Sequence, residues 1–247
     1  MEWTAEGTLC TASKHGENGI IAKIFTADHG LVAGYVPGGM GRRMRPILEP
    51  GNDVKARWRA RLADHLGTYQ VELITPRAAQ LMPKPLHLAA MTSLLTTLAQ
   101  CLPEREAYPA LKAGLDAILT VISAPSSDAA ILGAAVIRFE VELLSALGFA
   151  LDLAHCAATG QTEELIYVSP KTGRAVSQEA GEPYRDKLLA LPQFLLGSQA
   201  GPVDAAALSQ GFQLTGYFID RWVLEPQSRD VPAARRRFEH LLEKAPP

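Results

Sequence analysis

The chain has 247 residues, of which 47% are hydrophobic and 20% are charged, and its formal net charge is −2 at pH 7. The length allows one large domain or two ordinary ones. The composition is that of a folded globular protein and does not indicate a disordered chain. We expect neither a signal peptide nor a membrane span, because no apolar run has the required length or flanks. Three widely spaced cysteines, Cys10, Cys101 and Cys156, do not suggest a disulfide framework, so we expect a cytoplasmic protein.

The first 80 residues predict a small β-barrel. Short segments of alternating or β-branched residues are separated by glycine-containing turns, which is the spacing of consecutive strands. The expected strands are residues 3–13, 20–25, 31–36, 54–62 and 68–74. Five short strands at these spacings favour the partly open oligonucleotide/oligosaccharide-binding (OB) barrel, and we assign it to a domain of residues 1–80.

A glycine-rich basic loop precedes the fourth expected strand. Residues 38–45 read Gly-Gly-Met-Gly-Arg-Arg-Met-Arg, and we expect a flexible loop that presents Arg42, Arg43 and Arg45. Residues 40–62 contain seven of the 24 Lys and Arg but only two of the 26 Asp and Glu. A local excess of this kind suits a polyanion such as the backbone of a nucleic acid.

The fourth expected strand is itself basic. Residues 54–62 read Val-Lys-Ala-Arg-Trp-Arg-Ala-Arg-Leu, and successive side chains of a strand point to opposite faces. One face would therefore carry the cations Lys55, Arg57, Arg59 and Arg61, while Trp58 would point into the core. The alternative is a solvated face whose charges prevent edge-to-edge aggregation, but the scarcity of acids nearby in the sequence favours contact with nucleic acid.

The pattern becomes helical after residues 83–85. The expected helices are residues 86–102, 108–123, 128–147, 184–190, 204–222 and 231–242. Ser126, Ser127 or Asp128 can cap the third helix, Gly148 can end it, and Asp204 can cap the fifth. We therefore expect an α+β protein, in which the OB barrel is followed by an all-helical domain of residues 81–247. An irregular arm at about residues 155–183, with one short strand at residues 165–168, interrupts the helices.

The order and spacing of these features resemble the bacterial recombination mediator family RecO. Residues 14–18, Lys-His-Gly-Glu-Asn, are similar to the family's first hairpin turn, and residues 35–45 are similar to its glycine-rich basic loop. Residues 138–152 resemble the helix that leads to a cysteine, here Cys156, and residues 216–218 resemble a motif in the last long helix. The resemblance extends over the whole chain.

This resemblance implies a DNA repair and recombination mediator that binds single- and double-stranded DNA without sequence specificity and anneals complementary strands. It implies RecR, the C-terminal tail of the single-strand-binding protein and, indirectly, RecA as partners, in the bacterial cytoplasm and near the nucleoid. The implied DNA-binding residues are Arg42, Arg43, Arg45, Lys55, Arg57, Arg59 and Arg61. The acidic tail would bind the helical domain, in a groove that Arg138, Arg221 or residues 235–237 could flank.

Some relatives carry a zinc site in the arm, built from two Cys-x-x-Cys pairs. In this chain Cys156 keeps one ligand, whereas Thr159, Ser177 and Ala180 stand at the other three positions. One thiolate, even with His155, does not supply the four ligands of structural zinc. The arm therefore has the character of a degenerate zinc finger, and we expect no metal and no other cofactor.

Catalytic motifs are missing from the sequence. The six histidines show no metal-ligand spacing, and the chain has no nucleotide-binding loop and no Gly-x-Ser-x-Gly, so we expect no enzymatic activity. Two alternatives to a mediator stay open: a generic OB-fold module that binds RNA or acts in regulation, and a hydrolase that uses Asp28 and His29. The position of these two residues in a turn explains them more simply.

Overall fold

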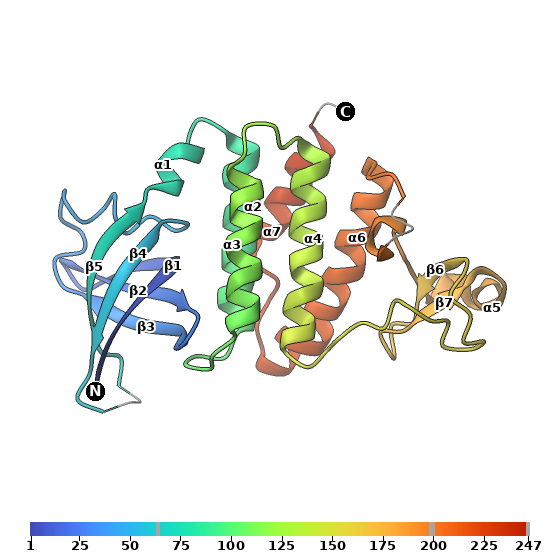
Figure 1. The fold of residues 1–247 in the computed structure, drawn as a ribbon, viewed down its shortest axis with the longest axis horizontal. Coiled ribbons are helices and arrows are strands. Elements are labelled where there is room, and N and C mark those ends of the chain that lie inside the picture. Colours follow the sequence, from blue (N-terminus) through green and yellow to red (C-terminus); the bar gives the residue numbers. More distant parts are fainter. Residues whose placement is uncertain (63–64, 198–200, 246–247) are drawn as a thin grey trace. The chain divides into compact units, whose positions relative to one another are not determined.

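The computed structural model describes residues 1–62, 65–197 and 201–245. It confirms the expected fold class, with an N-terminal barrel of five strands followed by helices (Figure 1). The chain forms two compact units, Met1–Ser123 and Ala124–Pro247. No helix in the described part of the chain is long and apolar enough to cross a membrane.

The barrel closes in the order β1-β2-β3-β5-β4. Its strands are β1 (Glu2–His15), β2 (Gly19–Thr26), β3 (Gly30–Val36), β4 (Asp53–Arg59) and β5 (Thr68–Thr75). The long β1 pairs with β4 through its N-terminal half and with β2 through its C-terminal half. β3 and β5 complete the closure by a parallel contact between Tyr35 and Thr68.

The alternation predicted for the basic strand is confirmed. Lys55, Arg57 and Arg59 are exposed, whereas Trp58 is only 3% exposed and lies in the barrel core. The strand ends at Arg59 instead of residue 62. Arg59 pairs with Glu2, which is the first residue of β1, so no residue of β1 is left to pair with residues 60–62. Arg61 therefore lies in the β4–β5 connection.

Three helices complete the first unit: α1 (Arg77–Leu81), α2 (Pro85–Cys101) and α3 (Pro109–Ser123). α2 packs on β1 and α3 on β2, so this unit continues past the change from strands to helices at about residue 80. The short α1 was not predicted; it is too brief to show a helical period. The division into domains of residues 1–80 and 81–247 stays a prediction.

The α2–α3 connection pairs with the edge of β3 through a parallel bridge between Leu31 and Glu104. The backbone N–H of Arg105 donates to the carbonyl of Leu31 (2.9 Å), and Lys23 forms an ion pair with Glu104 (2.8 Å). Phe25 and Leu31 are fully buried on the side of the barrel where this connection lies and α3 packs on β2. This side of the barrel is therefore used for packing within the unit.

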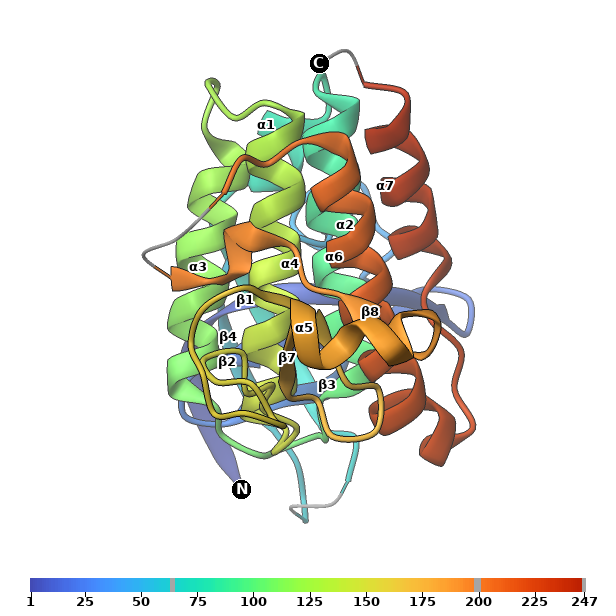
Figure 2. The same ribbon diagram turned by 90° about the vertical axis from the view of Figure 1, so that its right-hand side faces the viewer.

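The second unit is built on α4 (Ala129–Ala146), α6 (Ala205–Phe218) and α7 (Ala233–Glu243), which Figure 2 shows side by side. Asp204 accepts a hydrogen bond from the Ala207 N–H (2.7 Å), so the N-cap predicted there is confirmed. Of the three candidates for α4, the cap is Asp128, which accepts a hydrogen bond from the Ile131 N–H (2.9 Å). After Phe218 the helix continues as a π-helical segment, η4 (Ile219–Leu224), and a 3-10 turn, η5 (Glu225–Gln227).

The arm contains a small sheet of its own. The predicted strand β6 (Leu165–Val168) is confirmed, and it pairs with β7 (Ala175–Ser177) and β8 (Leu189–Ala190). The short elements α5 (Gln178–Gly181), η1 (Glu182–Lys187) and η2 (Gln193–Leu195) surround this sheet. The helix predicted at residues 184–190 is wrong: η1 is a 3-10 helix that ends at Lys187, and the next residues pair with the free edge of β6.

A buried ion pair joins the helices of the second unit. The Arg235 guanidinium donates to both carboxylate oxygens of Glu140 (2.8 and 2.9 Å) and also to the carbonyl of Phe212 (2.9 Å) and the hydroxyl of Thr215 (3.0 Å). Arg235 is 4% exposed and Glu140 2%. The suggestion that Arg235 flanks a peptide groove is therefore wrong; only Arg236 and Arg237 of that basic run are exposed.

We predict that Arg235→Met lowers the free energy of unfolding by about 3–5 kcal/mol, because it leaves the Glu140 carboxylate buried without its partner. Chemical denaturation measures the change. Arg237→Met, on the exposed side of the same helix, should shift it by less than about 0.5 kcal/mol. Adding Glu140→Met to Arg235→Met should recover part of the loss; equal effects of Arg235→Met and Arg237→Met would contradict the prediction.

Candidate nucleic-acid interface

The loop between β3 and β4 is an ordered series of turns in place of the flexible loop expected from the sequence. Backbone N–H groups of Met44 and Leu48 donate to the carbonyls of Gly41 and Met44 (both 3.0 Å). Leu48 is 3% exposed and belongs to the barrel core, and Met40, Met44 and Ile47 pack against that core. The arginines between these anchors, Arg42, Arg43 and Arg45, are exposed; we call them the loop arginines.

The loop arginines are held next to the β1–β2 turn. The Met40 N–H donates to the carbonyl of Asn18 (3.2 Å), and the Asn52 side-chain amide donates to the carbonyls of Pro46 and Ile47 (2.9 and 3.1 Å). No ion pair among the described residues involves a loop arginine. Asp53, one of the two acids in the basic segment, is instead engaged by Arg77 (2.8 Å). The loop therefore presents three uncompensated cations from a fixed backbone.

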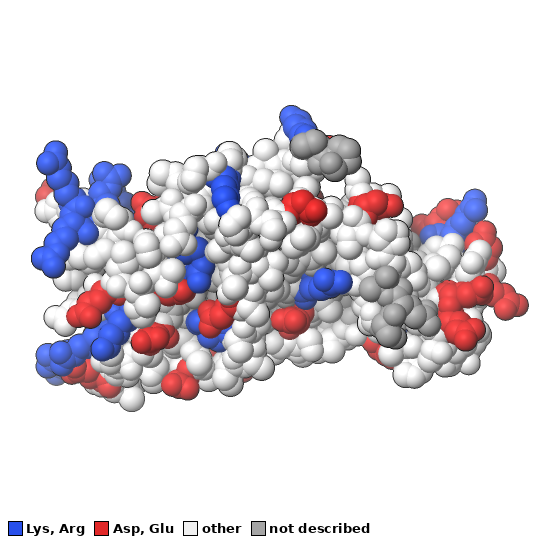
Figure 3. Space-filling view, turned by 45° about the horizontal axis from the view of Figure 1, so that its top comes forward, with Lys and Arg blue, Asp and Glu red and all other residues white. Residues whose placement is uncertain are grey.

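The outer face of β4 is different, because neighbouring strands supply carboxylates to it. Lys55 lies opposite Glu6 of β1 and Glu72 of β5, and Arg59 lies opposite Glu2. Arg57 forms an ion pair with Glu2. Three cations thus share this face with three carboxylates, and Figure 3 shows Lys and Arg over the barrel interspersed with Asp and Glu. The inference that acids are scarce near the basic strand is wrong, because these acids are distant only in the sequence.

The seven predicted residues therefore form three groups. The loop arginines lie together on one loop, Lys55, Arg57 and Arg59 lie together on the β4 face, and Arg61 is exposed in the β4–β5 connection. The loop contacts Leu9 and Asn18 around the second half of β1, whereas Arg59 pairs with the first strand residue, Glu2. The cations follow the length of β1 instead of surrounding one pocket.

An aromatic column that the sequence did not predict lies at the start of β1. The Trp3 ring stacks between His29 (centroids 4.3 Å apart, 17° between planes) and Trp58 (5.8 Å, 16°). Trp3 and His29 are half-buried, so the column extends from the core to the surface. Stacked aromatic rings are platforms for unpaired bases. The contact explains His29 as a packing residue and does not place it in a catalytic pair with Asp28.

Ligand contacts in OB folds commonly use the face of strands 2 and 3 together with the β1–β2 and β4–β5 loops. Here α3 packs on β2, and the α2–α3 connection pairs with the edge of β3 and contacts Lys23 through Glu104, so the β2–β3 face is partly occupied. The surfaces left open on the barrel are the loops, including the loop arginines, and the β4 face. An OB-type ligand would therefore lie on the side of β1, β4 and β5.

In the arm, Cys156, Thr159 and Ser177, which stand at three of the four positions compared with zinc ligands, lie close together. The Cys156 sulfur accepts a hydrogen bond from the Ser177 N–H (3.3 Å) and lies 3.4 Å from the Ser177 hydroxyl oxygen. Burial opposes ionisation of the thiol, but hydrogen bonds from Ser177 and Thr159 outweigh it and lower the pKa of Cys156 to about 6. One sulfur and two hydroxyls do not fit zinc, and the described residues contain no group of three or more His, Cys, Asp or Glu that could hold a metal ion.

The closed barrel with its cationic loop, joined to a helical region, places the chain in the class of OB-fold proteins. Two family models match it: Recombination protein O N terminal over residues 1–77 and Recombination protein O C terminal over residues 83–230. The chain belongs to the RecO family, as the resemblance indicated, and its role is in DNA repair and recombination.

Relatives of full length support this assignment. The DNA repair protein RecO of Methylorubrum populi is 47% identical over 246 residues, which are 98% of each chain. That of Rhodospirillum centenum is 48% identical over 247 residues, 99% of this chain and 96% of the relative. The RecO of Rhodospirillum rubrum is 42% identical over 248 residues, which cover 99% of this chain and 97% of the relative.

We predict that Ser177→Ala raises the pKa of Cys156 above about 6, because the hydroxyl no longer stabilises the thiolate. The ultraviolet absorbance of the thiolate as a function of pH measures it, and Cys156→Ser identifies the transition by removing it. Since the pKa of Cys156 in the folded chain lies below the ordinary thiol pKa of 9.0, ionisation stabilises the fold above pH 9.0, and this contribution is lost as the pH falls through about 6. An unchanged titration in Ser177→Ala would contradict the assignment.

Proposed function

We propose that this chain is a recombination mediator that binds single- and double-stranded DNA without sequence specificity and anneals complementary strands. The observation that supports it best is the group of loop arginines, which project from an ordered backbone with no ion pair within the described chain. A guanidinium binds phosphate oxygens in a bidentate manner. Contacts to phosphates position a nucleic acid but carry no sequence information, which suits annealing of any complementary pair.

The β4 face would act as an extension of the loop site. Side chains on one face of a strand repeat every ~6.6 Å, so Lys55, Arg57 and Arg59 form a row along the path from the loop to Arg61. At each cation of this row, a DNA phosphate competes with the cross-strand carboxylate for the positive charge. The loop arginines would therefore contribute most of the affinity, and the row would guide the strand. The His29–Trp3–Trp58 column offers a stacking surface to an unpaired base at the far end.

The mediator would pass DNA to partners and would catalyse no reaction itself. Membership of the family supports RecR, the tail of the single-strand-binding protein and, indirectly, RecA as these partners, at DNA in the nucleoid. Three of the basic residues suggested as flanks of the tail's groove make other contacts, which leaves the exposed Arg236 and Arg237 as the candidates. Arg138 lies over the Phe194 ring (5.6 Å), Arg221 pairs with Glu225 (2.7 Å), and Arg235 is buried.

We predict that combining Arg42→Ala, Arg43→Ala and Arg45→Ala weakens binding of single-stranded DNA by at least about tenfold at low salt. The slope of log K against log salt should become shallower by up to about 2, because each lost phosphate contact removes about 0.7. Fluorescence anisotropy over a salt series measures both. The matched control combines Lys171→Ala, Lys187→Ala and Lys244→Ala, three exposed lysines of the second unit, and equal losses in the two variants would exclude the loop.

We also predict that Glu6→Gln combined with Glu72→Gln strengthens DNA binding by about two- to fivefold, because both carboxylates flank Lys55 and repel phosphate. The gain should shrink at high salt, where exposed charges are screened. Glu163→Gln combined with Glu179→Gln makes the same charge change on exposed residues of the second unit. If only the Glu6 and Glu72 variant gains affinity, the β4 face contacts DNA; identical behaviour of the two variants would remove that face from the site.

Annealing of complementary strands coated with the single-strand-binding protein tests the mediator function directly. We expect the wild-type chain to accelerate annealing and the triple variant of the loop arginines to lose most of this activity. Tight binding of structured RNA without annealing would instead favour the generic OB-fold module. Metal-dependent turnover that disappears in His29→Ala would favour the hydrolase.

A further inference from the structure

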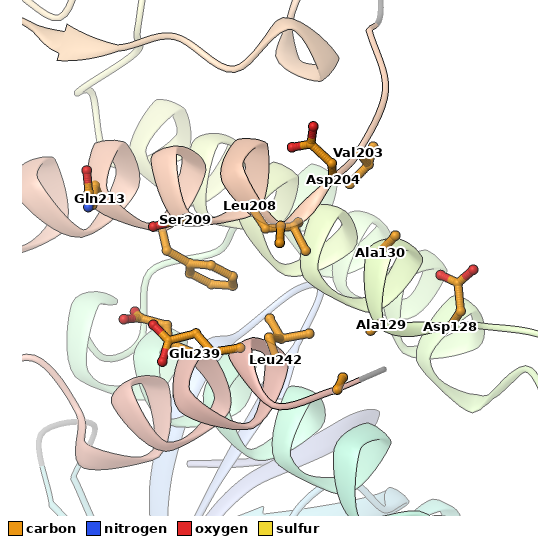
Figure 4. Close-up of a pocket in the computed structure, with 14 residues that line it drawn as sticks. Asp128, Ala129, Ala130, Val203, Asp204, Leu208, Ser209, Gln213, Glu239 and Leu242 are labelled. Carbon is orange, nitrogen blue, oxygen red and sulfur yellow. The ribbon is translucent and has the colours of Figure 1, made fainter. Parts of the chain in front are cut away.

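The second unit contains an open groove at one end of its helices. It has a volume of about 690 Å³ and lies between the N-terminal ends of α4 and α6 and the C-terminal half of α7 (Figure 4). Volumes of about 300–1,000 Å³ are typical of sites that enclose a drug-sized ligand or a few anchoring side chains. The groove is separate from the loop arginines and the β4 face, which belong to the other unit.

Apolar side chains form the floor of the groove. Leu208 and Phe212 of α6 are 8% and 5% exposed, and Leu242 of α7 is half-buried. Figure 4 shows Leu208 and Leu242 facing each other across the space, with Ala129 and Ala130 of α4 beside them. Leu208 and Phe212 are already largely buried, so an occupant with apolar side chains would gain mainly by covering Leu242 and the remaining exposed parts of these two residues.

The polar residues of the groove are strongly one-sided in charge. Asp128, Asp204, Glu239 and Glu243 line it, and none of the described lining residues is Lys or Arg. Glu239 forms an ion pair with the buried Arg235, and Asp128 and Asp204 cap α4 and α6. Arg235 is also shared with Glu140, so the four carboxylates outnumber the cationic charge beside them and the lining keeps a net negative charge. Asp128 and Asp204 lie towards one end in Figure 4 and Glu239 towards the other, so carboxylates border both ends. Glu239 and Glu243 also lie in the last part of α7, where the helix dipole adds negative potential.

We propose that this groove binds an amphipathic helix of another protein, one whose apolar face inserts between Leu208 and Leu242 and whose flanks carry Lys or Arg. An apolar helix face in a groove between helices is a common mode of recognition, and the carboxylates select the charge of the partner. An acidic segment would place its carboxylates against those of the groove. The site is therefore distinct in charge from one that receives an acidic tail, and it does not depend on DNA binding.

A synthetic helix of about 18 residues, roughly five turns, provides the probe. Its leucines are spaced at three and four residues, its flanks are lysine, and a matched peptide carries glutamate in place of lysine. Fluorescence anisotropy of labelled peptides with the full chain should show a Kd of about 10 μM for the lysine peptide, typical of a small interface, and at least about tenfold weaker binding of the glutamate peptide.

Substitutions in the groove locate the binding. Ser209→Trp fills the space from an exposed position on α6, whereas Ala206→Trp adds the same ring outside it on the same helix. Glu243→Lys reverses a charge at the edge, whereas Glu142→Lys makes the same change on an exposed residue of α4 outside the groove. We expect Ser209→Trp and Glu243→Lys to weaken binding at least about tenfold and the two controls to have little effect. Thermal unfolding verifies that each variant is folded.

Three outcomes would overturn the proposal. The first is equal binding of the lysine and glutamate peptides. The second is binding that a folded Ser209→Trp variant retains at full strength. The third is a wild-type dimer in sedimentation that Ser209→Trp alone dissociates, since a second copy of the chain would then occupy the groove.

Discussion

The pairing of β1 with both β2 and β4 determines the shape and the charge of the barrel surface that a ligand could contact. Its C-terminal half pairs with β2 and its N-terminal half with β4, which closes the sheet on itself. The same register places Glu2 and Glu6 against the β4 cations, stacks Trp3 on Trp58, and ends β4 at Arg59. One strand therefore determines the shape of the barrel, the charge of its open face and the end of its aromatic column.

The barrel separates its cations into two electrostatic classes. The β4 row is compensated by carboxylates on both neighbouring strands, so it contributes charge without a large net field. The loop arginines form no ion pair among the described residues, and Leu48 anchors their backbone in the core. Since α3 packs on β2 and the α2–α3 connection pairs with the edge of β3, the loop becomes the principal exposed cationic feature of the barrel in the described residues.

Local patterns of the sequence predicted the features that depend on period. The alternation of β4, the burial of Trp58, the caps Asp128 and Asp204 and the strand β6 all follow from neighbouring residues. The sequence did not show which distant residue each of these residues contacts in the folded chain. The carboxylates of Glu2 and Glu72 reach β4 only through strand register, Arg235 is buried because of Glu140, and residues 189–190 form a strand because β6 has a free edge. Period is a local property, whereas register and pairing are set by the whole fold.

The ion pair between Glu140 and Arg235 also bears on the order in which the chain folds during synthesis. Its two residues are 95 positions apart in the sequence. When α4 leaves the ribosome, the Glu140 carboxylate therefore has no guanidinium with which to form its ion pair. At typical elongation rates of about 5–20 residues per second, the partner follows roughly 5–20 s later. The barrel unit is complete in sequence by Ser123 and can fold during this interval, whereas the second unit must wait for its last helix.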